Sequence, residues 1–173
     1  MKIRLTREIK RRIPADVLGI LNDGIWLAGG VWRCLLQDKP VNDYDIFCRS
    51  YDAVSDVHEL LGDIGYVVDP SAEVTQDGNM IYVKGSTKVD LVQGVYYRNM
   101  LDAISDFDLT INQFISDGRY LVFTSDAISD LVGKVLRETS PGSSKTKDPN
   151  KILAFEDDGY SKKGDITGRQ LKD

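Results

Sequence analysis

Two aspartates stand two positions apart in the segment Asn42-Asp43-Tyr44-Asp45-Ile46. Side chains alternate between the faces of a β-strand, so both carboxylates project from one face while Tyr44 and Ile46 project from the other. Two like charges held side by side are unfavourable unless a cation joins them. Mg²⁺ prefers hard oxygen ligands, takes one or two protein carboxylates and completes its octahedron with waters and substrate phosphates. The pair therefore predicts a divalent-metal site that meets a phosphorylated substrate.

A glycine turn precedes this pair. Gly29 and Gly30 follow the apolar run Ile25-Trp26-Leu27-Ala28 and lead into a helix that we predict over 31–37. Paired glycines let the backbone approach a bulky anion, and the start of the following helix offers unpaired N–H groups to a phosphate. Arg33, one turn into that helix, adds a cationic side chain. Each motif alone is common, so the specific signal is their order: strand, Gly-Gly-x-x-Arg, helix, Asp-x-Asp.

This order resembles the signature of the polymerase-β-like nucleotidyltransferase superfamily. Within it, the residues around the motif are similar to the head domain of the tRNA CCA-adding enzyme and bacterial poly(A) polymerase family. The resemblance implies an α/β fold of the α+β type, with a mixed sheet of about five or more strands and helices mainly on one face. It also implies two-metal transfer of an NMP from an NTP to an acceptor hydroxyl, with release of pyrophosphate.

A later stretch resembles the strand that supplies the family's third metal-binding carboxylate. That stretch is Lys88-Val89-Asp90-Leu91-Val92, which implies that Asp90 joins Asp43 and Asp45 as catalytic metal ligands. The resemblance further implies one Mg²⁺ held by all three carboxylates, which lowers the pKa of the acceptor hydroxyl. A second ion, held by Asp43 and Asp45, would neutralise the triphosphate, and Mn²⁺ is the substitute metal.

Nucleotide contacts are implied in the same way. Gly29, Gly30 and Arg33 would position the phosphates. The run Phe107-Asp108-Leu109-Thr110-Ile111-Asn112-Gln113 resembles the family's Arg-Asp-Phe-Thr-Ile-Asn-Ala stretch, which implies that Asp108 and Asn112 organise the sugar and phosphates. Residues 148–155 are faintly similar to the family's neck helix, entered by Glu-Asp-Pro-x-Arg.

Three positions depart from the family pattern. Cys34 stands where the family has Asp, Phe107 stands where it has Arg, and Lys151 replaces an Arg that reads the base. Lysine cannot form the same planar bidentate pair, so we expect weak nucleotide selectivity. The chain ends soon after Phe155, whereas CCA-adding enzymes continue through domains that grip tRNA. We expect those parts to be absent here, and self-association or a partner protein to replace them.

The acceptor implied by the resemblance is an RNA 3′ end, as in tRNA processing. Two alternatives remain open. The first is a small transferase that modifies a protein or a small molecule, which the short chain and its acidic charge favour. The second is a non-catalytic interaction protein that kept the fold, because the Arg and Asp partners at positions 107 and 34 are missing.

Periodicity and turn residues predict the elements that position these side chains. Predicted helices cover 14–22, 31–37, 52–62, 99–105, 126–132 (capped by Ser125 or Asp126) and 151–155. Predicted strands cover 25–28, 43–48, 66–68, 73–76, 80–84, 88–97, 109–116, 120–124 and 135–136, with turns at Asp77-Gly78 and Asp117-Gly118.

Composition indicates one globular domain. The 173 residues are 42% hydrophobic and 28% charged, and no run approaches the roughly 18 apolar residues of a membrane helix. We divide the chain into a catalytic head (1–137), a flexible Ser/Thr/Gly-rich loop (138–150) and a short helix with a loose tail (151–173). Since the first residues carry charges where a signal peptide needs an apolar run, we expect a cytoplasmic protein with no membrane partner.

Other residue types exclude further classes. Two cysteines and one histidine provide neither a disulfide framework nor a Cys/His zinc cluster. The net charge of −5 argues against a broad basic face for nucleic acid. A local basic run, 2–12, remains as either a solvated terminus or a contact for RNA. We predict His58 as a surface or half-buried residue, with a role as a base or ligand as the alternative. We predict Trp32 as a core residue, with base stacking as the alternative.

Overall fold

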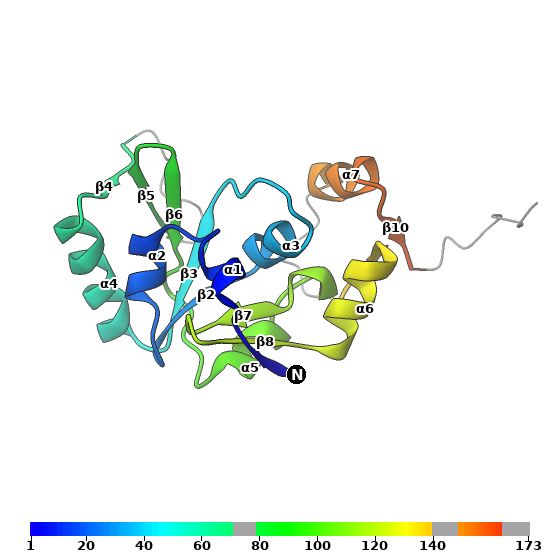
Figure 1. The fold of residues 1–173 in the computed structure, drawn as a ribbon, viewed down its shortest axis with the longest axis horizontal. Helices are drawn as coiled ribbons and strands as arrows, with labels where there is room; N and C mark the ends of the chain where they lie inside the picture. The colour runs from blue at the N-terminus through cyan, green and yellow to red at the C-terminus, as the bar shows by residue number, and fades with distance from the viewer. Residues whose placement is uncertain (71–78, 140–148, 164–173) are drawn as a thin grey trace, which may run out of the picture.

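The computed structural model of the chain describes residues 1–70, 79–139 and 149–163. Within them, one mixed sheet of eight strands carries the fold, and a small two-stranded sheet lies beside it (Figure 1). The strands are β1 (Lys2–Arg4), β2 (Ile25–Ala28), β3 (Tyr44–Cys48), β4 (Val67–Val68), β5 (Met80–Lys84), β6 (Thr87–Leu91), β7 (Phe114–Ser116), β8 (Tyr120–Phe123), β9 (Val135–Leu136) and β10 (Ser161–Lys162). The helices are α1 (Arg7–Lys10), α2 (Ala15–Ile20), α3 (Gly30–Leu36), α4 (Tyr51–Asp63), α5 (Met100–Ser105), α6 (Ser125–Gly133) and α7 (Pro149–Asp157), with a 3₁₀ turn, η1, at Thr110–Asn112.

The strand order of the large sheet is β1-β8-β7-β2-β3-β6-β5-β4. One inner pair, β3 and β6, is parallel, and the pairs on either side of it, β2–β3 and β6–β5, are antiparallel. The parallel register sets Asp45 beside Asp90, while the antiparallel register sets Ala28 beside Asp45. The sheet therefore brings Ala28, which ends β2 just before the glycine turn, together with two of the predicted carboxylates, Asp45 and Asp90.

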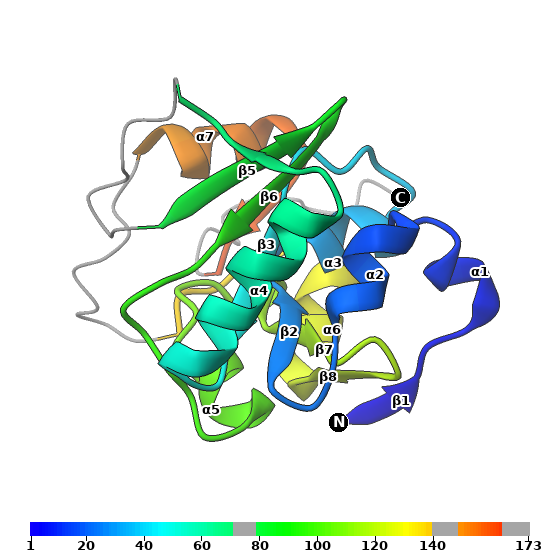
Figure 2. The same cartoon turned by 90° about the vertical axis from the view of Figure 1, so that its left-hand side faces the viewer.

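The main core lies on one face of the sheet. Helix α4 buries Val54, Val57 and Leu61, spaced three and four residues apart, against this face. It begins at Ser50, whose hydroxyl accepts the N–H of Ala53 at 3.2 Å. Apolar residues of α2 and α3 join the same core, and Figure 2 shows α2 and α4 together on this side. The mixed sheet with helices mainly on one face is confirmed.

A smaller core lies on the opposite face. Trp26 and Ala28 of β2 pack with Ala103 and Ile104 of α5, together with residues of β7 and β8. Helix α5 starts at Asn99, whose side-chain oxygen accepts N–H groups of α5 at 2.9 and 3.1 Å. Helix α5 thus covers the part of this face that is formed by β2, β7 and β8. The adjoining part of β3 and β6 carries Asp45 and Asp90 on the same face, lining a cavity.

Several sequence expectations need correction. The predicted strand 88–97 ends at Leu91, because one further ladder bond, from the Val92 N–H to the Ile46 oxygen, is followed by Gly94 at φ +75°. The predicted strand 109–116 begins instead as η1 and becomes strand only at Phe114. Helix α6 is capped by Thr124, whose hydroxyl accepts the Ala127 N–H at 3.1 Å, and not by Ser125 or Asp126.

Both ends of the chain also differ from expectation. Part of the basic N-terminal run is an edge strand, β1, paired with β8, and another part is α1. The start of the expected loose tail is ordered, since Tyr160 is buried against Phe155 and β10 pairs with β9. The predicted strand 73–76, the turn Asp77-Gly78 and most of the loop 138–150 lie outside the described residues. Among the described helices, none has the length and apolar character that a bilayer crossing requires.

Candidate active site

Asp45 and Asp90 form the centre of the candidate site. They are register partners on the parallel strands β3 and β6. Both are half-buried, while the alternating residues Tyr44, Ile46 and Val89 are buried on the other face. The two carboxylates line one cavity of about 500 Å³. Strand alternation and strand pairing together thus bring them side by side, as like charges on a shared wall.

Asp90 carries the clearest electrostatic signal. Its Oδ1 is buried with no hydrogen-bond partner. Burial and, next, the charge of Asp43 raise the pKa of this carboxyl, against the opposing effects of Lys88 and of a hydrogen bond from Asn79. Asp43, directly before β3 and half-buried, therefore acts on the same site.

These residues fit a hard divalent cation. An orphaned carboxylate oxygen beside a second carboxylate is the donor type that Mg²⁺ takes. In the described part of the chain, no three Asp, Glu, His or Cys side chains gather into a complete metal site. One or two protein carboxylates with water and substrate oxygens is a common donor set for Mg²⁺, so the incomplete protein set is compatible with that ion.

Position 29 favours glycine for two reasons, its backbone conformation and its closeness to the carboxylate of Asp45. Its φ is +80°, and a Cβ built on it would lie 3.1 Å from Oδ2 of Asp45. Its N–H donates to the Phe114 oxygen at 3.0 Å, which ties the turn to β7. Any side chain at position 29 would both strain the turn and press on Asp45. The Gly-Gly turn and the Asp-x-Asp motif are therefore in direct contact.

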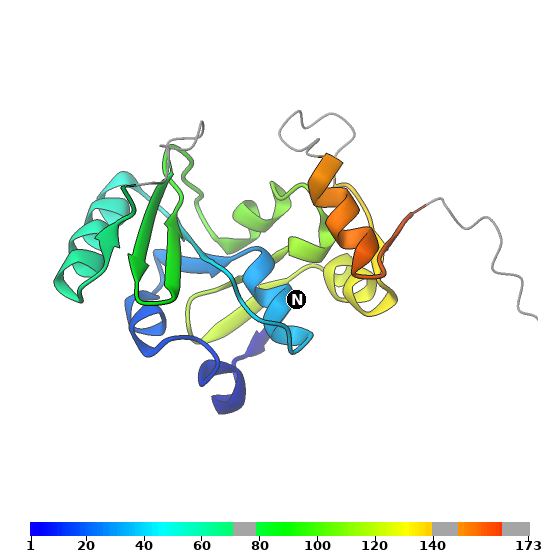
Figure 3. The same ribbon diagram turned by 90° about the horizontal axis from the view of Figure 1, so that it is seen from above.

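Arg33 lies on the other side of the glycine turn and is already engaged. Its Nη1 donates to Oδ1 of Asn112 at 2.7 Å, and its guanidinium carbon lies 4.5 Å from the ring centroid of Phe155. A Cβ on Gly30 would lie 3.4 Å from Nη2 of Arg33. One guanidinium thus joins α3, η1 and α7. Figure 3 shows α7, in orange, at the opposite end of the molecule from α4. Asp108, just before η1, is half-buried, and its backbone oxygen accepts the Thr139 N–H at 3.0 Å.

An aromatic cluster, formed by Phe47, Tyr97 and Phe107, lines the cavity of Asp45 and Asp90. The Phe47 ring lies 5.4 Å from Phe107 and 6.3 Å from Tyr97, centroid to centroid. The Tyr97 hydroxyl donates to Oδ2 of Asp106 at 2.8 Å. Burial and this carboxylate raise the pKa of Tyr97. Among the described residues that line the cavity, none is Lys or Arg.

Sequence reasoning missed this cluster. Phe47 lies two residues beyond Asp45, so strand alternation alone would have placed it beside the carboxylates. Tyr97 and Asp106 come from a loop and from the end of α5, and no local pattern indicates where they meet. Phe107, noted only as a missing Arg, is an apolar wall of the cavity.

Two other interpretations are settled. Trp32 is fully buried and donates its indole N–H to the Leu27 oxygen at 2.8 Å, so it belongs to the core and has no face free for a base. His58 is exposed on α4, and its Nδ1 is hydrogen-bonded to the Tyr82 hydroxyl. Cys34 is half-buried on α3.

A family model described as "Gad2: Gabija anti-defense 2 family protein" matches residues 4–134. No curated protein matches the chain.

Solved structures match over most of the chain. The Thermotoga maritima CCA-adding enzyme complexed with tRNA is 18% identical, with a TM-score of 0.68 over 94% of this chain and 43% of that one. A CCA-adding enzyme complexed with ATP is 17% identical, with a TM-score of 0.68 over 94% and 43%. A tRNA-processing enzyme in an apo form is 25% identical, with a TM-score of 0.60 over 90% and 42%.

The chain thus spans less than half the length of each of these proteins. The resemblance to nucleotidyltransferase head domains is confirmed, and the fold is nucleotidyltransferase-like.

Proposed function

This chain belongs to the Gabija anti-defense 2 family, and we propose that it is a Mg²⁺-dependent nucleotidyltransferase that counters the defense named in the family description. The observation that carries the proposal is the pair of register-matched carboxylates: Asp45, which lies against the glycine turn, and Asp90, which has an orphaned buried oxygen. Its nucleotidyltransferase-like fold supports the same chemistry. We expect the protein to act in the cytoplasm, where NTPs are available.

In this proposal Asp43, Asp45 and Asp90 hold divalent metal. When bound, Mg²⁺ would lower the pKa of the acceptor hydroxyl and neutralise charge on the phosphates. Gly29 leaves room against Asp45, and the cation of Arg33 faces the phosphates. An acceptor oxygen forms a bond to the α-phosphorus, the bond from that phosphorus to the pyrophosphate oxygen breaks, and the hydroxyl proton leaves to solvent.

Asp108 and Asn112 take the ribose side in this proposal, following the resemblance to the family stretch. The hydrogen bond from Arg33 to Asn112 supports a linked arrangement, because it couples the phosphate side to the sugar side through one pair of atoms 2.7 Å apart. Phe155 lies against the same guanidinium at 4.5 Å, so α7 is the element whose position would follow nucleotide binding.

The first candidate acceptor is an RNA 3′ end, because the structural relatives include enzymes solved with tRNA. An RNA end carries a phosphate on every nucleotide, and proteins hold phosphates mainly with Lys and Arg. Self-association or a partner protein would therefore have to supply the Lys and Arg contacts to RNA that the cavity lacks.

A second candidate acceptor is favoured by the cavity itself. The described lining beside Asp45 and Asp90 contains three aromatic rings and no Lys or Arg. Such a wall suits an acceptor hydroxyl on a planar or apolar group without phosphates. The acceptor in this case would be a protein or a small molecule that belongs to the defense system countered by this protein.

The test is label transfer. The full chain is incubated with Mg²⁺ and each α-³²P-labelled NTP, together with total RNA in one set and total protein and small molecules in another. We expect label in one acceptor class, and a higher melting temperature with Mg²⁺ and the preferred NTP. Folded protein that shows neither label nor a thermal shift with any of the four NTPs would contradict the proposal and favour the non-catalytic interpretation.

A further inference from the structure

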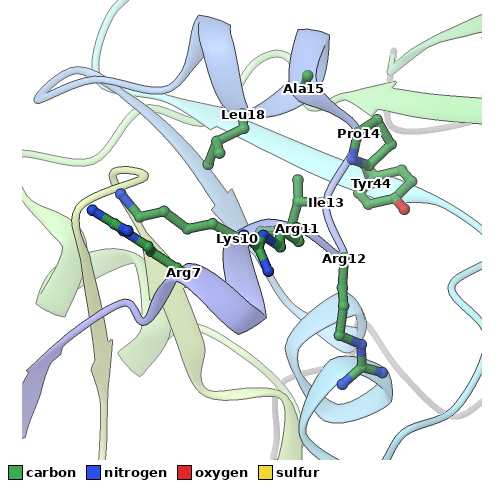
Figure 4. Close-up of a pocket in the computed structure, with 9 residues that line it drawn as sticks. All are labelled: Arg7, Lys10, Arg11, Arg12, Ile13, Pro14, Ala15, Leu18 and Tyr44. Atoms are coloured by element: carbon green, nitrogen blue, oxygen red, sulfur yellow. The ribbon is translucent and has the colours of Figure 1, made fainter.

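A second cavity, which we call the basic groove, lies where α1 leads into α2 (Figure 4). Its volume is about 570 Å³. Four cations line it, namely Arg7, Lys10, Arg11 and Arg12, and its remaining lining is apolar or aromatic, including Pro14, Leu18 and Tyr44. No Asp or Glu is among the described residues that line it.

The basic groove is separate from the candidate active site. Tyr44 lines the groove, whereas Asp45 lines the cavity of the candidate active site, which we call the acidic cavity. These neighbours on β3 project from opposite faces of the strand. A ligand in the groove therefore does not occupy the nucleotide or acceptor site. Binding at the groove and nucleotide transfer can be tested separately.

Three of the four cations have no ion-pair partner among the described residues. Arg12 donates to Oδ1 of Asp38 at 2.7 Å and to the Leu35 oxygen at 2.5 Å. Within the described part of the chain, Arg7, Lys10 and Arg11 form no ion pair. Spacings of three and four residues put them on neighbouring positions of a helical turn, where like charges repel. Figure 4 shows Arg7 and Lys10 extending side by side.

This charge is unusual for the chain as a whole, whose net charge is −5. Repulsion among close cations is relieved by an anionic ligand. The groove therefore has the charge complementarity of a site for an anionic partner.

The apolar floor distinguishes between anionic partners. A phosphate backbone has no apolar group that could fill a surface formed by Pro14 and Leu18. A single-stranded base would need an exposed ring to stack on, and Tyr44 is only 8% exposed. An apolar centre with an arginine-rich rim is typical of protein–protein contact surfaces.

We propose that the basic groove is a docking site for an acidic segment of a partner protein, in which Asp or Glu residues flank an apolar side chain. The apolar side chain lies against Leu18 and Pro14, and the carboxylates pair with Arg7, Lys10 and Arg11. Arginine contributes most, because its fork forms bidentate pairs with carboxylate.

The experiment uses the full chain and an array of short randomised peptides. We expect the bound peptides to be enriched in Asp and Glu next to Leu, Ile, Phe or Met. The variant Arg7→Glu with Arg11→Glu should lose roughly tenfold or more in affinity for the selected peptides. Leu18→Ser should weaken the same peptides without changing the salt dependence of binding, since it removes an apolar contact and no charge.

The matched control is Arg98→Glu with Lys163→Glu, which reverses the same number of exposed charges elsewhere and should leave affinity unchanged. Melting temperatures confirm that each variant is folded. Peptides without acidic enrichment, or a groove variant that binds as well as the parent, would overturn the proposal. So would binding of single-stranded or duplex DNA that the groove variant abolishes while peptides fail to bind, because the ligand would then be a nucleic acid.

Discussion

Tyr44 and Asp45 are neighbours in the chain but line two cavities of opposite character. On one face of β3 lies the cavity beside Asp45, which is lined by the carboxylates of Asp45, Asp90 and Asp106. No Lys or Arg is among its described lining. On the other face the cavity beside Tyr44 holds four cations and, among its described lining, no Asp or Glu. One strand thus separates a site suited to metal and nucleotide from a site suited to an acidic partner.

The two cavities are also built differently. The acidic cavity is held by the sheet, because strand register fixes Asp45 against Asp90 and Gly29 leaves the space for Asp45. The cations of the basic groove are exposed or half-buried side chains of a four-residue helix and the segment after it. Changes on the acidic side should therefore alter chemistry and stability together, while changes of Arg7, Lys10 or Arg11 should alter binding with little effect on stability.

The largest expected effect is on nucleotide transfer. Asp45→Asn should lower the transfer rate by roughly 10³-fold or more, because metal-assisted charge stabilisation is worth several kcal/mol and each ~1.4 kcal/mol is a factor of ten. The rate is measured as label transferred from the preferred NTP. Peptide binding at the basic groove should not change.

The reciprocal experiment completes this comparison. Arg7→Glu with Arg11→Glu should leave the transfer rate to a small acceptor unchanged while peptide affinity falls. Asp63→Asn, an equal change at an exposed position of α4, is the control for Asp45→Asn. If Asp45→Asn and Asp63→Asn transfer label equally well, the assignment of Asp45 is wrong.

A smaller effect is expected from Gly29→Ala. Alanine at φ +80°, with its Cβ 3.1 Å from Oδ2 of Asp45, should lower the free energy of unfolding by roughly 1–3 kcal/mol. Urea unfolding measures this loss. The matched control lies on the basic side: Gly19→Ala in α2 has no atom within 4 Å of the added Cβ, and should be neutral or stabilise by up to about 1 kcal/mol. Equal losses at both positions would show that close packing at Asp45 does not limit position 29.

Local sequence patterns predicted the centre of the fold better than its edges. Strands β2 and β5 and helix α4 were predicted within one residue at each end, because an apolar run or a helical repeat extends through each of them. Strands β1 and β10 contain two or three exposed residues. Such short elements have no buried alternation, so only their partners β8 and β9 define them.

The residues of the candidate site also differ in how well local sequence patterns predicted them. The spacing of Asp43, Asp45 and Gly29 indicated a shared site, and the structure puts Gly29 in contact with Asp45. Asp90 came only from the resemblance, since a single acid in a strand has no signal of its own. Tyr97 and Asp106 meet through tertiary packing, which no local pattern encodes. The role of these carboxylates as metal ligands stays a prediction.

Arg33 offers a third contrast, because it has internal partners, whereas Arg7, Lys10 and Arg11 of the groove form no ion pair with described residues. Arg33→Met removes the hydrogen bond to Asn112 and the contact with Phe155, and should cost roughly 1–2 kcal/mol of unfolding free energy. Arg7→Met, at an exposed position without an internal ion pair in the described residues, should cost less than about 0.5 kcal/mol. Thermal unfolding of the two variants checks this. A larger loss for Arg7→Met would reverse the interpretation of which cation is structural.

The smallest expected effect concerns Asp16, which lies next to the groove-lining Ala15. Burial acts to raise the pKa of Asp16, but Lys84 and the Val17 N–H outweigh it, so the pKa lies below the ordinary 3.8. A carboxyl with a lowered folded pKa stabilises the fold fully above its unfolded pKa, and this contribution is lost as the pH falls through the folded value. The pair of Asp16 and Lys84, 3.0 Å apart and partly exposed, is worth about 0.2–1 kcal/mol.

Lys84→Met should therefore lower the unfolding free energy by that small amount at pH 7, and by less at a pH well below the folded pKa of Asp16. Urea unfolding at the two pH values measures the difference. Tyr44 and Tyr66 also face Asp16, but burial, and then the charge of Asp16, raise both of their pKa values above the ordinary 10.0, so neither titrates in the acid range. The Lys84 ammonium also lies 5.4 Å from the Tyr66 ring centroid, and Lys84→Arg keeps that cation as the control. A loss that is the same at both pH values would assign the effect of Lys84 to Tyr66 and not to Asp16.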